Sequence, residues 1–110
     1  MISEADIDKA LSYLRDNANE DAQARAERLY LEEFKKTVLA QEQAKSTAQS
    51  VAASEIDART SDAFLKTLEN YKTAIYNDER RRFLRSAAEA KIEAWRTLES
   101  TRRAEAKGYK

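Results

Sequence analysis

The chain has 110 residues, of which 36% are charged, and it contains no histidine, cysteine or proline and a single glycine. These absences exclude nucleophiles activated by histidine, zinc sites built from thiolate or imidazole ligands, and glycine-rich loops that cradle phosphates. The bias toward Ala, Glu, Lys, Leu and Arg is typical of long helices and coiled coils. We therefore expect a single all-α domain that is not an enzyme and that holds no cofactor or metal ion.

The sequence shows no targeting or membrane segment. Residues 1–4 lack the basic and then apolar layout of a signal peptide. No apolar run is longer than three residues, which is far short of a membrane span. The absence of cysteine fits a reducing compartment. The expected location is the cytoplasm, and neither a membrane nor a small-molecule substrate is expected as a partner.

The first predicted helix covers residues 4–17. Ser3 and Asp6 form a variant of the capping box, which marks a helix N-terminus. Apolar residues then recur every three or four positions, as on one face of a helix: Ile7, Ala10, Leu11 and Leu14. The segment Asn17-Ala18-Asn19 is expected to end this helix, because asparagine favours turns. Asn19 or Asp21 can then cap the next helix.

The second predicted helix covers residues 20–53. Its apolar stripe ends in four alanines at i+4 spacing, namely Ala40, Ala44, Ala48 and Ala52. A row of small side chains lets another helix approach closely. Homodimerisation through these alanine-rich faces is one expected consequence, because few large apolar residues are available for a self-sufficient core.

Residues 54–61 form the expected turn of a helical hairpin. The capping residues Ser54, Thr60 and Ser61 indicate this turn, although the segment has no glycine or proline to stop the helix. A turn near residue 58 places residue i opposite about residue 116 − i, so that Phe34 faces Arg82. A continuous helix through this segment is the alternative.

The third predicted helix covers residues 61–107. Its expected apolar face begins with Phe64, Leu65, Leu68, Tyr71 and Ile75. After a polar interval the face resumes at Phe83 and includes Trp95. Every residue from 77 to 82 is polar, which leaves a bend, a solvated segment or a gap between two helices as alternatives. Together the three segments predict a short N-terminal helix packed on a long antiparallel, coiled-coil-like helical hairpin.

Charge is unevenly distributed along the chain, although the total is zero. Residues 1–79 carry 10 basic and 16 acidic side chains, whereas residues 80–110 carry 10 basic and 4 acidic ones. Internal pairing of the basic segment with Asp21, Glu32 and Glu33 is the favoured interpretation, because the charges balance. The alternative is an anionic partner such as nucleic acid. The candidate residues for contact with a protein or nucleic-acid partner are Arg80, Arg81, Arg82, Arg85, Arg96, Arg103 and Tyr76, the last of which is expected to be exposed.

The C-terminal segment resembles a known group of proteins. Ile92-Glu93-Ala94-Trp95-Arg96-Thr97, followed by Arg102-Arg103-Ala104-Glu105-Ala106-Lys107-Gly108, is similar to the endings of small helical proteins encoded by bacteriophages and prophages. The resemblance implies a short accessory protein in a bacterial cytoplasm. Such proteins often act on host machinery, in phage DNA metabolism or in particle assembly. It implies no catalytic residues.

The sequence therefore favours a non-enzymatic protein that binds or helps to assemble another protein. The first alternative is nucleic-acid binding through the arginine-bearing helix, and the second is a structural oligomer such as a virion component. The first interpretation makes exposed apolar residues the important ones. The nucleic-acid interpretation instead gives that role to the arginines between residues 80 and 85.

Overall fold

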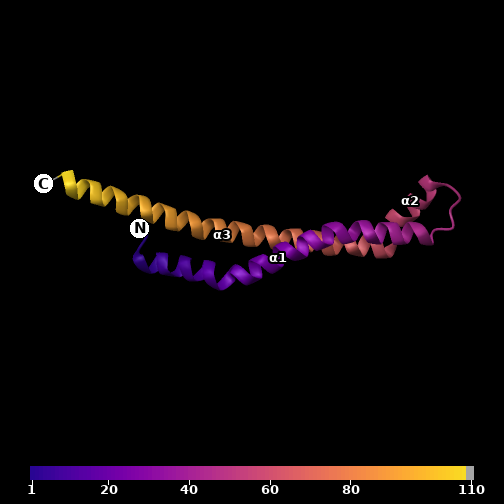
Figure 1. Ribbon diagram of the computed structural model, residues 1–110, viewed down its shortest axis with the longest axis horizontal. Coiled ribbons are helices and arrows are strands. Elements are labelled where there is room, and N and C mark those ends of the chain that lie inside the picture. Colours follow the sequence, from indigo (N-terminus) through magenta and orange to yellow (C-terminus); the bar gives the residue numbers. More distant parts are fainter. Residues whose placement is uncertain (109–110) are drawn as a thin grey trace. The chain divides into compact units, whose positions relative to one another are not determined.

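The computed structural model describes residues 1–108, which form three helices (Figure 1). Helix α1 spans Glu4–Lys45, α2 spans Val51–Arg59 and α3 spans Asp62–Gly108. None of the described residues belongs to a β-strand. The all-α prediction is therefore confirmed. Over these residues, no helix carries an apolar stretch long enough to cross a membrane.

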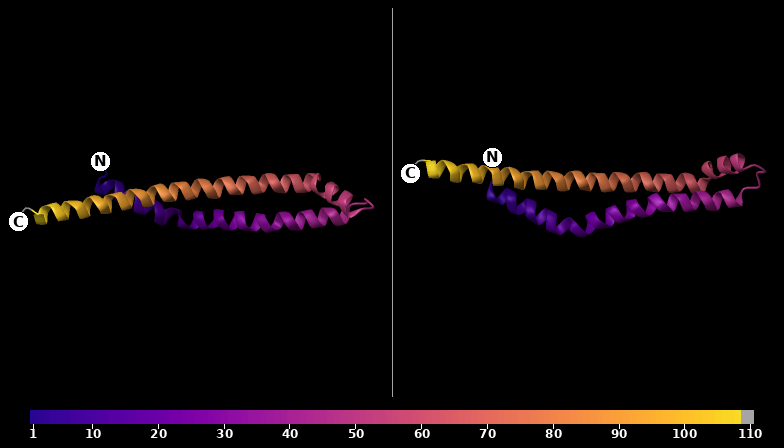
Figure 2. Two further views of the ribbon diagram at one scale, coloured as in Figure 1. Left: turned by 90° about the horizontal axis from the view of Figure 1, so that it is seen from above. Right: turned by 45° about the horizontal axis from the view of Figure 1, so that its top comes forward.

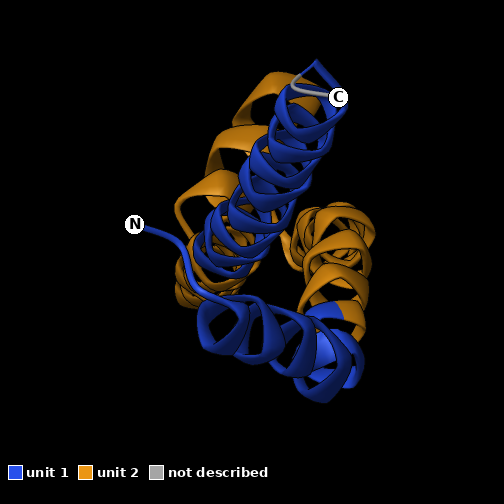
Figure 3. Ribbon diagram, turned by 90° about the vertical axis from the view of Figure 1, so that its left-hand side faces the viewer, with its two compact units in different colours: residues 1–21, 80–110 blue, residues 22–79 orange. Residues whose placement is uncertain are grey.

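The chain divides into two compact units, each of which contains part of α1 and part of α3 (Figure 3). Unit 1 comprises residues 1–21 and the part of α3 that begins at Arg80. Unit 2 comprises residues 22–79. Helix α2 and the loops on either side of it belong wholly to unit 2.

Within unit 2, α1 and α3 lie side by side and run antiparallel (Figure 2). Arg28 contacts Asp78, and the ammonium group of Lys35 lies 4.8 Å from the ring centroid of Tyr71. Residue i thus lies opposite about residue 106 − i. The predicted antiparallel hairpin with a short packed helix is confirmed, but the short helix lies between the two long ones and not at the N-terminus. The predicted pairing of i with 116 − i is wrong by about ten residues.

The register differs because α1 ends at Lys45 and not near residue 53. The hydroxyl group of Ser46 accepts a hydrogen bond from the amide of Ala48 (3.1 Å) and donates its hydrogen to the carboxylate of Asp57 (2.6 Å). Ser50 caps α2 by accepting a hydrogen bond from the amide of Ala53 (3.0 Å). The hydroxyl groups of Ser46 and Ser50 thus form hydrogen bonds with backbone amides that need no helix. Residues 46–50 accordingly form a loop. The short packed helix is therefore α2.

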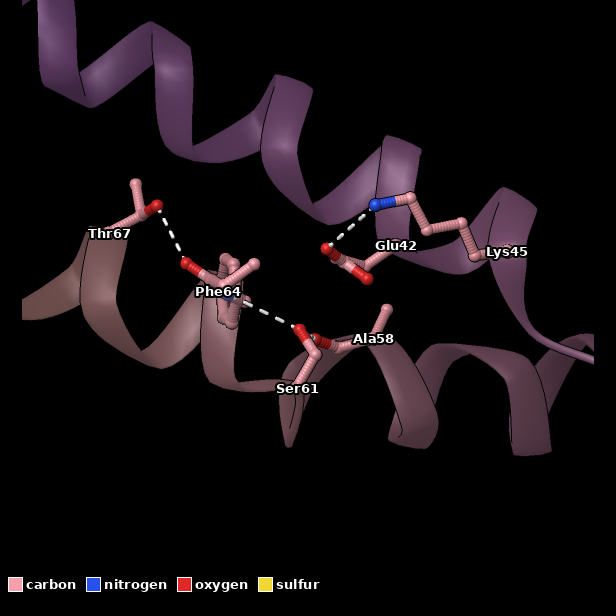
Figure 4. Close-up of polar contacts among 7 residues, drawn as sticks. Glu42, Lys45, Ala58, Ser61, Phe64 and Thr67 are labelled. Atoms are coloured by element: carbon pink, nitrogen blue, oxygen red, sulfur yellow. Dashed lines mark hydrogen bonds and ion pairs between the residues drawn. The ribbon is translucent and has the colours of Figure 1, made fainter.

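The junction between α2 and α3 coincides with only the end of the turn predicted for residues 54–61, because residues 54–59 belong to α2 (Figure 4). The Ser61 hydroxyl donates to the carbonyl of Ala58 (2.7 Å) and accepts from the amide of Phe64 (3.2 Å). Thr60 also donates its hydroxyl hydrogen to the Ile56 carbonyl (2.8 Å). These bonds give partners to backbone groups at the end of α2 and at the start of α3. The predicted start of the third helix at residue 61 is confirmed to within one residue, and the continuous-helix alternative is wrong.

The predicted break at residues 17–19 is also wrong, because α1 continues through it. The side-chain amide of Asn17 donates to the carbonyl of Tyr13 (2.9 Å), four residues earlier. Asparagine is thus accommodated inside the helix by a hydrogen bond to the preceding turn. Residues 4–17 are consequently the first turns of α1. Helix α3 likewise continues through residues 77–82, which excludes a gap between two helices there.

The capping box at the start of α1 forms as predicted. The Ser3 amide and hydroxyl both donate to one carboxylate oxygen of Asp6, at 2.9 and 3.0 Å. The Asp6 amide donates in return to the Ser3 hydroxyl oxygen (3.2 Å). The hydrogen bond from the Ser3 backbone stabilises the charged carboxylate and lowers the pKa of Asp6 below its ordinary value.

The hydrophobic core is narrow and built largely from small side chains. Among the described residues, no large side chain is completely buried. Trp95, which was predicted to lie in the core, is only half-buried. The buried apolar residues are Ile7, Ala10 and Ala88 in unit 1, and Ala24, Leu31, Val38, Ala58, Phe64 and Ala74 in unit 2.

Candidate functional site

Two of the arginines that were predicted to contact a partner belong to an ion-pair cluster in unit 1. Asp21 is buried, and its two carboxylate oxygens contact the guanidinium groups of Arg81 (3.3 Å) and Arg85 (3.2 Å). The two arginines lie four residues apart on α3, where like charges repel. The buried carboxylate between them offsets that repulsion. The structure therefore contains the internal pairing of Arg81 and Arg85 with Asp21 that the sequence analysis favoured.

A second cluster joins α1 and α3 in unit 2. Arg28 contacts Glu79 at 2.8 Å and Asp78 at 3.3 Å. The hydrogen bond to Glu79 is the largest influence on Arg28 and raises the pKa of its guanidinium group. Asp78 and Glu79 belong to the run of polar residues in which the apolar pattern of α3 lapses. Their position is explained by this cross-helix pairing.

The other two predicted acidic partners of the arginines are placed elsewhere. Glu33 contacts Lys36 on its own helix (3.2 Å), and both side chains are exposed. Glu32 is exposed as well. These predictions were wrong because the pairing register differs by about ten residues from the expected one. In the actual register the part of α1 around Glu32 lies opposite α3 near residue 74.

The remaining predicted contact residues do not gather into one basic site. Arg80 and Arg103 are exposed. The Arg82 guanidinium lies 5.1 Å from the ring centroid of Phe83. Arg96 pairs with Glu93 one turn earlier, at 3.4 Å, with both side chains 70% exposed. Tyr76 belongs to unit 2 and is 68% exposed, as the sequence predicted for this side chain.

The structure reveals an exposed face of α3 that the sequence did not single out. In unit 2, Leu65 and Tyr76 are 47% and 68% exposed. They are eleven residues apart, close to three helical turns, so they project from the same side of α3. The buried residues Thr67 and Ala74 lie on the opposite side of the helix. Leu65 had been expected in the apolar core, and that prediction is wrong.

Two charged residues lie between Leu65 and Tyr76 on this side of α3. Glu69 and Lys72 are both exposed. Glu69 follows Leu65 by four residues, Lys72 follows Glu69 by three, and Tyr76 follows Lys72 by four. Each spacing is close to one turn of 3.6 residues, so the four side chains form a stripe. We refer to Leu65, Glu69, Lys72 and Tyr76 as the outer α3 face.

The other exposed aromatic residues of unit 2, Tyr30 and Phe34, stack on each other. Tyr30 and Phe34 lie one turn apart on α1, with ring centroids 5.5 Å apart and ring planes inclined by 13°. This stacking shields part of each ring, and Phe34 is 36% exposed. Tyr76 has no such aromatic neighbour among the described residues. It is the more accessible of the two aromatic sites in unit 2.

The described residues were also compared for clusters of metal-ligating side chains. Among residues 1–108, no group of three or more potential metal-ligating side chains lies close enough to hold an ion. Comparisons of the chain with known protein families, with characterised proteins and with solved structures found no match.

Proposed function

We propose that this chain is a non-enzymatic protein-interaction factor and that the outer α3 face is its contact surface. The observation that carries the proposal is the exposure of Leu65 and Tyr76 on the side of α3 opposite its buried residues. The two side chains flank Glu69 and Lys72 on one exposed side of the helix, where both are available for contact with another protein. Tyrosine is also enriched among the residues that contribute most to binding energy.

The size of the expected contribution supports this surface as a binding site. Burying a large apolar side chain contributes about 1.5–3 kcal/mol relative to its exposed state. Leu65 and Tyr76 are already partly covered, so burial of the two together contributes about 2–4 kcal/mol. Neither side chain needs to give up an existing partner, because both project away from α1. A modest protein contact is the expected result.

Within this proposal the protein acts as an accessory factor on a host or phage protein in a bacterial cytoplasm. The similarity of residues 92–97 and 102–108 to the endings of phage-encoded proteins supports that setting. Nucleic-acid binding receives less support from the geometry. Arg81 and Arg85 already contact Asp21, so a phosphate would have to replace a buried carboxylate.

A photo-crosslinking amino acid placed at position 76 tests the proposal. The matched control carries the same amino acid at position 30, because Tyr30 is a tyrosine of the same unit with a similar exposed fraction, 59% against 68%. After irradiation in a bacterial lysate, position 76 is expected to give discrete protein adducts and position 30 only background. Adducts of equal yield at the two positions, or adducts only with nucleic acid, would contradict the proposal.

A further inference from the structure

The outer α3 face has an order of side chains that is self-complementary. Along the helix it runs apolar, acidic, basic, apolar, as Leu65, Glu69, Lys72 and Tyr76. Glu69 and Lys72 are exposed, and neither forms an ion pair with any part of the described chain. Read in the opposite direction, the stripe is apolar, basic, acidic, apolar. When a second stripe runs antiparallel to the first, each apolar side chain therefore lies opposite an apolar one, and each charged side chain lies opposite one of the other sign.

The spacing of these residues fits such a pairing. In two antiparallel helices, residues whose numbers have a constant sum lie opposite each other. The sum is the same, 141, for Leu65 with Tyr76 and for Glu69 with Lys72. Both contacts thus form in one register, with a two-fold axis that passes between Asn70 and Tyr71. That axis is also the midpoint of the α3 segment in unit 2, residues 62–79.

We propose that two copies of this chain associate through their outer α3 faces in this antiparallel register. Leu65 of each copy then contacts Tyr76 of the other, and Glu69 of each copy pairs with Lys72 of the other. The proposal rests on the contact surface proposed above and adds self-association, in which a second copy of the chain occupies that surface when no other protein is bound to it. A parallel arrangement in register is disfavoured, because it places the two glutamates together and the two lysines together.

The affinity expected of this dimer is low. The stripe has four residues on each copy, and the contact is smaller than the roughly 1,200 Å² of buried surface at the lower limit of stable interfaces. Its apolar contacts must also offset the loss of rotational and translational freedom on association. We expect a reversible dimer with a dissociation constant on the order of 10 μM or higher.

Two charge reversals test the register directly. Glu69→Lys places lysines opposite each other at both contacts of the dimer, and Lys72→Glu places glutamates opposite each other. Each variant alone is expected to dimerise about tenfold more weakly than the unmodified chain. An equimolar mixture of the two variants restores opposite charges at both contacts. The mixture is therefore expected to form a heterodimer about as readily as the unmodified chain forms its dimer.

Sedimentation equilibrium over a concentration series measures these associations, and far-UV circular dichroism verifies that each variant is folded. Leu65→Glu is expected to abolish the dimer, whereas Leu29→Glu is expected to leave it unchanged. Leu29 is a matched control because it is 49% exposed, against 47% for Leu65, and lies on α1 of the same unit.

Three results would overturn the dimer. They are a monomeric unmodified chain at millimolar concentration, a mixture of charge variants that associates no better than either alone, and equal effects of the two leucine substitutions. A monomer that still gives adducts with another protein at position 76 rejects the dimer and leaves the proposed function intact. A monomer without such adducts rejects both.

Discussion

Replacing Phe64 with alanine is expected to lower the free energy of unfolding by about 3 kcal/mol. Phe64 is 6% exposed and is the largest side chain in the core of the described chain. It packs beside the junction of α2 and α3, where Ala58 is completely buried (Figure 4). Alanine leaves a cavity in a core that has few other large residues. Urea unfolding followed by circular dichroism, at one fixed protein concentration, measures the change.

Phe83→Ala is the matched control for this substitution. Phe83 is also on α3 but is 65% exposed, and its ring contacts the exposed Arg82 guanidinium. Its removal is expected to cost less than about 1 kcal/mol, because little buried surface is lost. Equal losses for the two phenylalanines would mean that Phe64 does not lie in the core of unit 2 as described.

Replacing Asp21 with asparagine is expected to cost about 2–3 kcal/mol of stability. Asp21 is 8% exposed, and its carboxylate is the charge that lies between Arg81 and Arg85. Asparagine has nearly the same shape but no charge, so the two guanidinium groups are left to repel each other. Because both arginines retain contact with solvent, the cost falls below that of breaking a fully buried pair.

Asp16→Asn provides the control for Asp21→Asn. Asp16 pairs with Arg15 at 3.1 Å, but both side chains are largely exposed, at 64% and 75%. Exposed pairs of this kind contribute about 0–1 kcal/mol. Thermal unfolding in low and moderate salt compares the two variants. An Asp21→Asn variant as stable as the Asp16→Asn variant would show that the arginines do not depend on this carboxylate.

Local sequence signals were sufficient where the interaction is local. The Ser3 and Asp6 capping box, and the hydroxyl residues at the start of α3, are recognisable because each bond spans three or four residues. The all-α class follows from composition in the same way. The end of α1 was missed because four alanines at i+4 spacing suggested a continuing helix. The serine and threonine residues between positions 46 and 50 were the contrary signal.

The register of the hairpin could not be obtained from local signals. It depends on where α1 ends, and an error of a few residues there changes every cross-helix contact. Asp21 was named among the acidic partners of the basic segment, and the structure confirms its pairing. Glu32 and Glu33 were named on the same reasoning and lie elsewhere. Long-range ion pairs become predictable only after the register is known.

The candidate surface was only partly predictable. The exposure of Tyr76 was expected from the polar residues that follow it, and the structure confirms it. Leu65 was expected in the core because Phe64 and Leu65 are adjacent and both fit a helical apolar stripe. The choice between them depends on which side of α3 contacts α1, and that information is not contained in the periodicity of α3.

Hydroxyl-radical footprinting of Tyr76 and Tyr30 tests whether the outer α3 face is the contact surface of the protein. In the dilute free chain both tyrosines are expected to be oxidised, because both are well exposed. At high protein concentration, or in a bacterial lysate, oxidation of Tyr76 is expected to fall while that of Tyr30 stays unchanged. Mass spectrometry of the two peptides provides the comparison. Unchanged oxidation of Tyr76 under every condition, or equal protection of both tyrosines, would contradict the assignment of the outer α3 face as the contact surface.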